Sequence, residues 1–221
     1  MVDLRVYAVL DMGNAAPDAL PDIAAAAVAG GATLLQLRGK DAPTRLQIDL
    51  ARAILSAVGG RVPLLVNDRA DVALAARTQG VHVGHGDLLP EEARALLGPD
   101  AIVGLTVHTD EEAAAAPVAA IDYASIGGVF ATTTKANAHA PIGVDGFAAI
   151  AGILRGRRSD LPLTAIAGIT VERAAALVDA GADGVAVVSA IAAADDPRAA
   201  AERLRAAVDR ALAARLASVS P

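Results

Sequence analysis

Short apolar runs alternate with amphipathic segments of helical period along almost the whole chain, with a strand-like run about every 20 to 30 residues. The runs are apolar on both faces, as expected for parallel strands buried between a core and surrounding helices. The predicted strands are Val6–Leu10, Thr33–Leu37, Pro63–Val66, Val81–Val83, Ala101–Leu105, Tyr123–Gly127, Leu163–Ile166 and Val185–Val188.

Helical patterns separate these strands, and glycine follows several of them, where a helix often ends in a left-handed residue. The predicted helices are Asp18–Val28, Pro43–Val58, Asp71–Arg77, Pro90–Leu97, Asp110–Ala116, Val144–Leu154, Val171–Asp179 and Pro197–Leu216. This order predicts an α/β fold, a single-domain (β/α)8 TIM barrel over residues 1–221. The alternative, an open doubly wound sheet, usually has a glycine-rich dinucleotide loop after its first strand, and here Gly13 stands alone.

Composition narrows the class of protein. Hydrophobic residues make up 54% of the 221 residues and aromatic residues 2%, so aliphatic side chains must fill the barrel. The absence of cysteine excludes disulfides and thiolate chemistry. The net charge of −6 argues against a general nucleic-acid binder.

We see neither a signal peptide nor a membrane-spanning run, so we expect a cytoplasmic protein without nucleic-acid or membrane partners. The composition is compatible with a homo-oligomer.

Polar residues that can perform chemistry follow directly after the predicted strands, which in a parallel barrel places them at one end. The first group is Gln36-Leu37-Arg38-Gly39-Lys40. Arg38 offers a planar fork and Lys40 a point charge, and together they can bind one anion. Gln36 alternates onto the side of Arg38 and can reach the barrel mouth. The alternative is a solvated basic turn.

Two carboxylates follow neighbouring strands. Asn67 and Asp68 come after the third strand, and Asp87 follows the fourth after a Gly84-His85-Gly86 turn. Such a pair suits Mg²⁺, which completes its shell with water and substrate phosphates. We therefore expect one Mg²⁺ per active site. The alternative makes Asp87 the N-cap of the Pro90–Leu97 helix.

Two further segments indicate phosphate binding. Thr132, Thr133, Thr134 and Lys135 lie in the long 131–143 connection, where hydroxyls and backbone N–H groups can form a cradle. The alternative is a surface turn rich in threonine. Gly168 and Ser189 follow the last two strands, a frequent phosphate site in barrels.

The histidines indicate neither a general base for catalysis nor a group of metal ligands. His82 lies inside a strand and is expected to be an interior residue with hydrogen-bond partners. No histidine pair has metal-ligand spacing, and no Ser–His–Asp set is indicated. The best-supported chemistry is charge stabilisation, of the kind that departure of pyrophosphate requires.

The segments QLRGK, VNDRADVALA, GVHVGHGD, GLTVH, DYASIGGVFATTTK, AIAGI and GADGVAVVSAI occur in this order. In these segments the chain resembles the thiamine-phosphate synthase family, from the first strand to Ile191. The resemblance implies a TIM-barrel transferase that joins a pyrimidine pyrophosphate to a thiazole phosphate with Mg²⁺, giving thiamine monophosphate and pyrophosphate. It also implies a dissociative mechanism, in which pyrophosphate leaves before the thiazole nitrogen attacks.

The resemblance further implies roles for individual residues. Arg38, Lys40, Thr106 and Lys135 would act in catalysis, and Asp68 and Asp87 would bind the metal. The residues implied to contact the pyrimidine substrate are Gln36, Leu37, Arg38, Gly39, Lys40, Asn67, Thr106 and Lys135. The residues implied to bind the thiazole phosphate are Thr132, Thr133, Thr134, Gly168, Val188 and Ser189. The family usually has serine where Thr106 stands, so a hydroxyl is kept with an added methyl.

Two alternatives remain at this point. A related thiazole tautomerase shares the barrel but joins nothing, and it has no need of a pyrophosphate site. A non-catalytic binder of thiamine phosphates would have no use for two magnesium carboxylates. Metal-dependent formation of product from both substrates separates the synthase from either alternative.

Overall fold

The structure is a computed structural model that describes residues 1–132 and 140–219. Eight parallel strands close into a barrel in chain order, and β8 pairs back onto β1 through Val6 and Val185. The strands are β1 (Val6–Asp11), β2 (Leu34–Arg38), β3 (Leu64–Asn67), β4 (Gly80–Val83), β5 (Ile102–Val107), β6 (Tyr123–Ile126), β7 (Leu163–Ile166) and β8 (Gly184–Val187). The predicted single-domain (β/α)8 barrel is confirmed.

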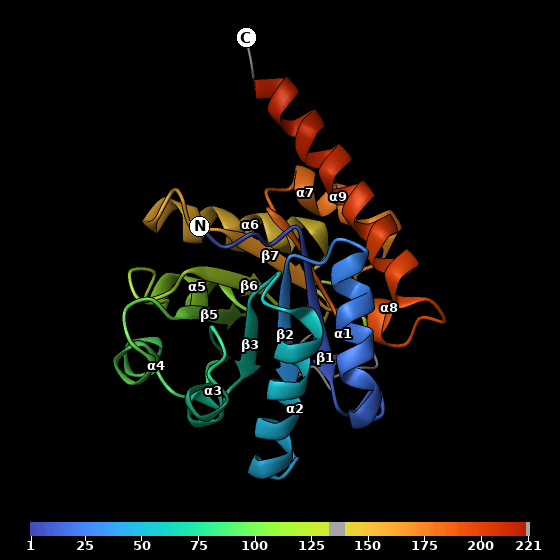
Figure 1. Cartoon of the computed structure of the whole chain (residues 1–221). Coiled ribbons are helices and arrows are strands. Elements are labelled where there is room, and N and C mark those ends of the chain that lie inside the picture. Colours follow the sequence, from blue (N-terminus) through green and yellow to red (C-terminus); the bar gives the residue numbers. More distant parts are fainter. Residues whose placement is uncertain (133–139, 220–221) are drawn as a thin grey trace.

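Helices connect the strands and surround the barrel (Figure 1). They are η1 (Pro17–Ala19), α1 (Leu20–Ala29), α2 (Thr44–Val58), α3 (Ala70–Ala76), α4 (Pro90–Leu97), α5 (Asp110–Ala115), α6 (Gly143–Arg157), α7 (Val171–Asp179), α8 (Ser189–Ala192) and α9 (Pro197–Val219). The predicted helix Asp18–Val28 divides into η1 and α1, and α6 continues beyond the predicted end to Arg157. The sequence did not predict α8, because four residues are too few to show a helical period.

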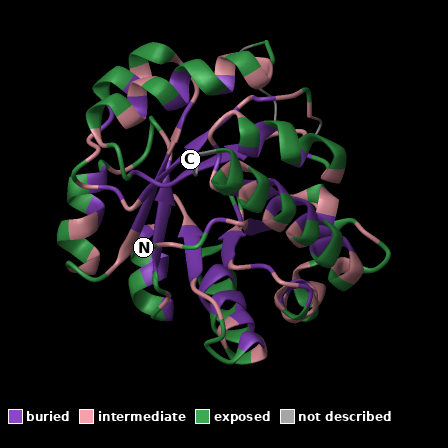
Figure 2. Ribbon diagram, turned by 90° about the horizontal axis from the view of Figure 1, so that it is seen from above, coloured by how far each residue is buried: buried purple, intermediate pink, exposed green. Residues whose placement is uncertain are grey.

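Strand side chains alternate between two hydrophobic layers. Outward-facing residues such as Leu35, Leu37 and Val66 pack with the inner faces of the helices. Inward-facing residues such as Tyr7 and Leu65 fill the barrel. Figure 2, seen from above, shows buried strands at the centre and helices whose exposed residues face outward. This double burial explains why the strands read as continuous apolar runs.

Polar side chains form a connected chain inside the barrel. Gln36 Nε2 donates to Tyr7 Oη, and Tyr123 Oη donates to Tyr7 Oη at 2.9 Å. His82 Nδ1 lies 2.7 Å from Tyr123 Oη, and His82 Nε2 lies 2.6 Å from Thr106 Oγ1. Burial raises the pKa of both tyrosines, which stay neutral. The prediction of His82 as an interior residue with partners is therefore confirmed.

Gly104 makes room for this chain of side chains. A Cβ atom at Gly104 would lie 2.2 Å from Cζ of Tyr123 and 2.5 Å from Nδ1 of His82, so any side chain there would displace both rings. Glycine at this strand position therefore reflects close approach of aromatic groups rather than a turn.

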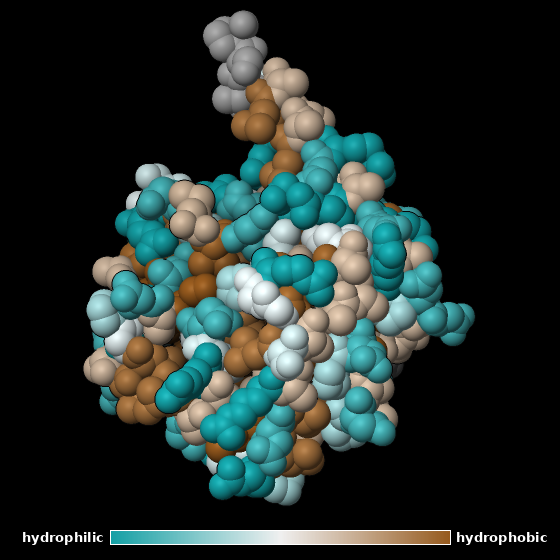
Figure 3. All heavy atoms as spheres, viewed as in Figure 1, coloured by the Kyte–Doolittle hydropathy of each residue, from teal (hydrophilic) through white to brown (hydrophobic). Residues whose placement is uncertain are grey.

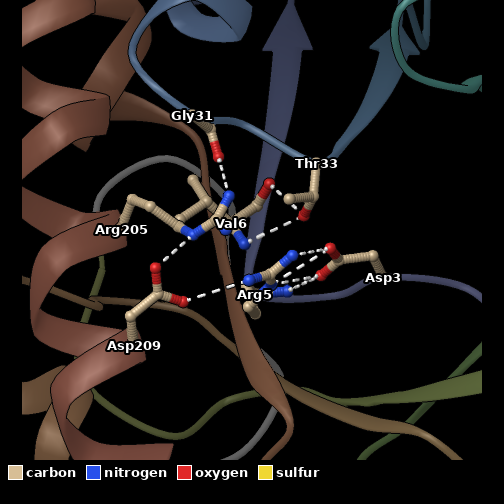
Figure 4. Close-up of polar contacts among 7 residues, drawn as sticks. All are labelled: Asp3, Arg5, Val6, Gly31, Thr33, Arg205 and Asp209. Atoms are coloured by element: carbon tan, nitrogen blue, oxygen red, sulfur yellow. Dashed lines mark hydrogen bonds and ion pairs between the residues drawn. The ribbon is translucent and has the colours of Figure 1, made fainter.

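An ion-pair network joins the start of β1 to α9 (Figure 4). Arg5 Nε bonds to Asp3 at 3.0 Å, and its Nη1 reaches Asp209 Oδ1 of α9 at 3.4 Å. Arg205 Nε bonds to the other Asp209 oxygen at 2.7 Å, and its Nη1 donates to the Gly31 carbonyl. One carboxylate on α9 thus holds two arginines at the amino-terminal end of the barrel.

We expect Asp209→Ala to lower the free energy of unfolding by about 1 kcal/mol or less, because all three charged groups are partly exposed to solvent. Turnover should not change, since the network lies at the barrel end opposite the strand tips. Thermal unfolding checks this, with Glu202→Ala as the control that removes an exposed pair on the same helix. A fall in turnover without loss of folded protein would contradict the purely structural role.

The surface shown in Figure 3 mixes hydrophilic and hydrophobic residues, and hydrophobic atoms gather at the lower left, where Figure 1 places α3 and α4. Exposed leucines of this region are Leu74 of α3 and Leu96 of α4. Within the described parts of the chain, no helix is both long enough and apolar enough to cross a bilayer.

Candidate active site

A cavity opens at the carboxyl ends of the strands, the lower end of the β2 and β3 arrows in Figure 1. It brings together polar residues from every part of the described chain. Its lining includes Asp11, Gln36, Arg38, Asn67, His82, Thr106, Ser125, Thr132, Gly168, Val188 and Ser189. Eight residues that the sequence singled out as substrate-binding thus share one cavity: Gln36, Arg38, Asn67, Thr106, Thr132, Gly168, Val188 and Ser189. Their contact with substrate stays a prediction.

Other predicted site residues do not line the cavity, and the two predicted metal ligands Asp68 and Asp87 are among them. The Leu37 side chain is fully buried between the barrel and the helices, so only its main chain is left for a ligand contact. Lys40 is exposed in the loop after β2, and Gly39 is buried, where a Cβ atom would lie 2.4 Å from Met12 Sδ. Thr133, Thr134 and Lys135 lie outside the described residues.

Arg38 forms an ion pair with Asp11, its neighbour in the register of β1 and β2. Asp11 is only 4% exposed, and its second oxygen accepts a hydrogen bond from the Gly13 N–H at 2.8 Å. The carboxylate therefore fixes the guanidinium at the edge of the cavity. Sequence reasoning missed this role of Asp11, although its place at a strand end was the available signal.

Asp68 occupies a turn that few residues adopt. Its φ is 62°, and Arg69 N–H donates to the Asn67 carbonyl across it at 2.7 Å. Asp68 N–H in turn donates to the His82 carbonyl of β4 at 2.8 Å. Left-handed backbone at a non-glycine residue is uncommon and tends to occur at functional sites. Here it holds a carboxylate at the tip of β3.

Asp87 belongs to the turn after β4. Its Oδ2 accepts from Gly84 N–H at 2.8 Å, which folds the side chain back towards the strand end. Helix α4 has Leu89 as its N-cap, with Glu92 accepting from the Leu89 N–H, so the alternative role of Asp87 as that N-cap is wrong. Asp71 lies in the first turn of α3 and pairs with Arg69, a structural role.

The carboxyl groups of Asp68 and Asp87 lie close enough to share a hydrogen bond. Burial, together with the hydrogen bond and negative charge of Asp87, raises the pKa of Asp68 to about 6, and the positive charge of Arg38 partly opposes this. Two neighbouring carboxylates of this kind can share a cation, which offsets their mutual repulsion.

The donor set fits a magnesium ion better than a closed zinc site. Among the residues that the structure describes, no group of three or more His, Cys, Asp or Glu side chains could enclose a metal. Mg²⁺ is commonly held by one or two carboxylates, with water and substrate phosphates as its other ligands. Asp68 and Asp87 can supply that number and kind of ligand.

The loop after β6 and the loop after β7 are joined to each other by hydrogen bonds, across the barrel from the ends of β3 and β4. Phe130 N–H donates to the Ala167 carbonyl at 3.1 Å. Arg173 of α7 donates to the Gly168 carbonyl at 2.6 Å, and its guanidinium lies 4.4 Å from the centre of the Phe130 ring. Ser189, the first residue of α8, follows β8 beside them in the cavity wall. Barrels frequently bind phosphate with backbone N–H groups at this place.

We expect Gly168→Ala to weaken binding of a phosphorylated ligand about tenfold, because displacement of the loop would cost the ligand about one hydrogen bond. Gly168 has a φ of 65°, and a Cβ atom there would lie 2.5 Å from the Ala131 carbonyl oxygen. Steady-state KM values for each substrate test this, with Gly156→Ala on the exposed side of α6 as the control. Equal KM values in the variant and the wild type would show that the loop tolerates the side chain.

Comparisons with known proteins agree with one another. The family model described as thiamine monophosphate synthase matches residues 6–191. A thiamine-phosphate synthase of Agrobacterium fabrum is 47% identical, with 97% of this chain and 98% of that protein covered. A thiamine-phosphate synthase of Roseiflexus is 44% identical, with 94% and 86% covered.

A solved structure shows the same likeness in three dimensions. The thiamine phosphate pyrophosphorylase from Pyrococcus furiosus superposes with a TM-score of 0.81 at 33% identity, covering 96% of this chain and 98% of that one. The family model spans β1 to α8, the whole segment that carries the barrel and its cavity. The chain belongs to the thiamine monophosphate synthase family of enzymes.

Proposed function

We propose that this chain transfers the pyrimidinylmethyl group of an aminopyrimidine diphosphate to the nitrogen of a thiazole phosphate, forming thiamine monophosphate and pyrophosphate. The single observation that carries this proposal is that groups able to bind two separate anions line one cavity at the carboxyl ends of the strands. Arg38 lies at the tip of β2, and the Gly168 and Ser189 loops follow β7 and β8. Asp68 and Asp87 follow β3 and β4, outside the lining itself. Two phosphorylated substrates can then meet in one cavity.

The proposed mechanism breaks one carbon–oxygen bond and forms one carbon–nitrogen bond. The carbon–oxygen bond between the pyrimidine methylene and the diphosphate breaks, and its electron pair leaves with pyrophosphate. The thiazole nitrogen then donates its lone pair to the resulting cation and forms the new carbon–nitrogen bond. Arg38, Lys40 and Lys135 stabilise the charge that develops on the leaving group. A bound Mg²⁺ held by Asp68 and Asp87 would neutralise part of that same charge.

Thr106 contributes a hydroxyl to the same side of the cavity. Its Oγ1 lies 2.6 Å from Nε2 of His82, whose other nitrogen is bound to Tyr123. The interior chain therefore holds the Thr106 hydroxyl in one orientation at the cavity wall, and its proposed role is to contact the diphosphate there. A thiazole tautomerase needs no site for a departing diphosphate, and the arrangement of Arg38, Asp68 and Asp87 does not favour it.

The direct test is formation of thiamine monophosphate by the purified protein from both substrates, with Mg²⁺ or with EDTA. We expect product and pyrophosphate in equal amounts, and only with the metal. Binding of the thiazole phosphate without any product would instead support a tautomerase or a non-catalytic binder.

The magnesium requirement should depend on pH. Because the pKa of Asp68 is raised to about 6, a proton competes with the cation below that pH. We expect the apparent Kd for Mg²⁺ to rise about tenfold for each pH unit below about 6, and to level off above about 7. Calorimetric titration of Mg²⁺ across this range measures the effect. A Kd that stays constant from about pH 5 to about pH 8 would exclude Asp68 as the titrating ligand.

A further inference from the structure

Ser125 of β6 carries a buried hydroxyl without a hydrogen-bond partner. The residue is only 2% exposed, and its Oγ is the one buried side-chain oxygen without a partner among the described residues. Buried hydroxyls are nearly always satisfied, because leaving one unpaired is unfavourable. An unpaired hydroxyl in a native barrel calls for a specific physical explanation.

The residues beside Ser125 on the two neighbouring strands form hydrogen bonds, so this part of the barrel does not prevent a hydroxyl from finding a partner. Ser125 lies in register with Thr106 of β5 and Thr164 of β7. The Thr106 hydroxyl is bound to His82, and the Thr164 hydroxyl donates to the Gly184 carbonyl at 3.2 Å. Ser125 also differs from the fully buried Thr164 in its position, because Ser125 lines the cavity and Thr164 does not.

Among the described residues, the floor of the cavity around Ser125 carries polar side chains but no Asp, Glu, Lys or Arg. Gln36, Tyr7 and His82 line it: Gln36 donates to Tyr7, and Tyr123 joins Tyr7 to His82. The charged groups Arg38 and Asp11 lie at the strand tips, one layer closer to the mouth. A ligand that fills both layers would place its phosphates at the tips and a neutral polar ring at the floor.

We propose that the Ser125 hydroxyl is a substrate-contacting group that hydrogen-bonds the nitrogen-bearing edge of the pyrimidine ring. This inference rests on the proposed function and names a residue that recognises one of its two substrates. An aminopyrimidine has ring nitrogens that accept and an amino group that donates, and a hydroxyl can serve either. The thiazole is the less suitable partner, because a hydrogen bond to its nitrogen would occupy the lone pair that attacks.

The test compares Ser125→Ala with Thr164→Val by calorimetric binding of the pyrimidine diphosphate, with Mg²⁺ present, and of the thiazole phosphate. We expect Ser125→Ala to raise the Kd for the pyrimidine substrate about five- to tenfold, the range of one neutral hydrogen bond. The Kd for the thiazole phosphate should not change. The Tm of the ligand-free Ser125→Ala variant should equal or exceed that of the wild type, because the substitution removes an unpaired buried hydroxyl.

The matched control removes a hydroxyl that is already paired. Thr164→Val should lower the Tm and leave both Kd values unchanged. An unchanged Kd for the pyrimidine substrate in Ser125→Ala, or an equal loss of affinity for both substrates, would overturn the inference. Product formation by the wild-type enzyme, measured in parallel, reports on the proposed function separately, since it does not depend on either variant.

Discussion

The Asp68→Ala variant is expected to lose turnover by roughly a hundredfold or more, and its remaining activity should respond only weakly to Mg²⁺. Asp68 and Asp87 lie within hydrogen-bonding reach of each other at neighbouring strand ends. Removal of one carboxylate leaves a single protein ligand, and the charge that develops on the diphosphate then lacks most of its compensation. Initial rates over a range of Mg²⁺ concentrations measure both effects.

Asp71→Ala is the matched control, because Asp71 lies three residues further along the same chain segment and forms an exposed ion pair with Arg69. It should keep the wild-type magnesium response. If Asp68→Ala and Asp87→Ala both kept that response as well, the metal site would have to lie elsewhere.

Stability data distinguish loss of the metal from loss of the fold. The folded-state pKa of Asp68 lies above its ordinary value of 3.8, so its contribution to stability is complete at low pH and is lost as pH rises through about 6. Above that pH the buried carboxylate opposes folding in the metal-free protein. We therefore expect Asp68→Asn to unfold at a higher temperature than the metal-free wild type near neutral pH, while remaining inactive.

Arg38→Met is expected to reduce kcat/KM for the pyrimidine substrate by about a hundredfold to a thousandfold. It should also lower the free energy of unfolding by about 3 kcal/mol, because Asp11 would remain buried without its partner. Kinetics with each substrate varied in turn, together with denaturant unfolding, measure the two effects.

A second variant separates these two effects. Asp11→Asn combined with Arg38→Met removes both charges, so it should recover most of the stability and none of the activity. Arg38→Lys keeps the charge without the planar fork, and we expect intermediate activity. Recovery of activity in the double variant would mean that Arg38 acts only by neutralising Asp11.

The hydrophobic pattern by itself determined the barrel. Runs such as Leu163–Ile166 and helices such as Pro90–Leu97 and Val171–Asp179 have the same bounds in the sequence prediction and in the structure. The local pattern is sufficient for this because strands buried on both faces read as short continuous apolar runs, whereas helices buried on one face read as longer segments with helical period. The placement of polar residues at strand ends also predicted that residues as distant as Gln36 and Ser189 would share one cavity.

Only the tertiary structure decided which polar groups interact, which stay unpaired and which have a shifted pKa. The ion pair of Asp11 with Arg38, the raised pKa of Asp68, and the unpaired hydroxyl of Ser125 all depend on strand register and burial. These are properties of neighbouring strands, and a pattern read along one strand does not contain them. Closure of the barrel brings residues from many strand ends to one cavity, and their proximity there sets the charges, the hydrogen bonds and the chemistry of the site.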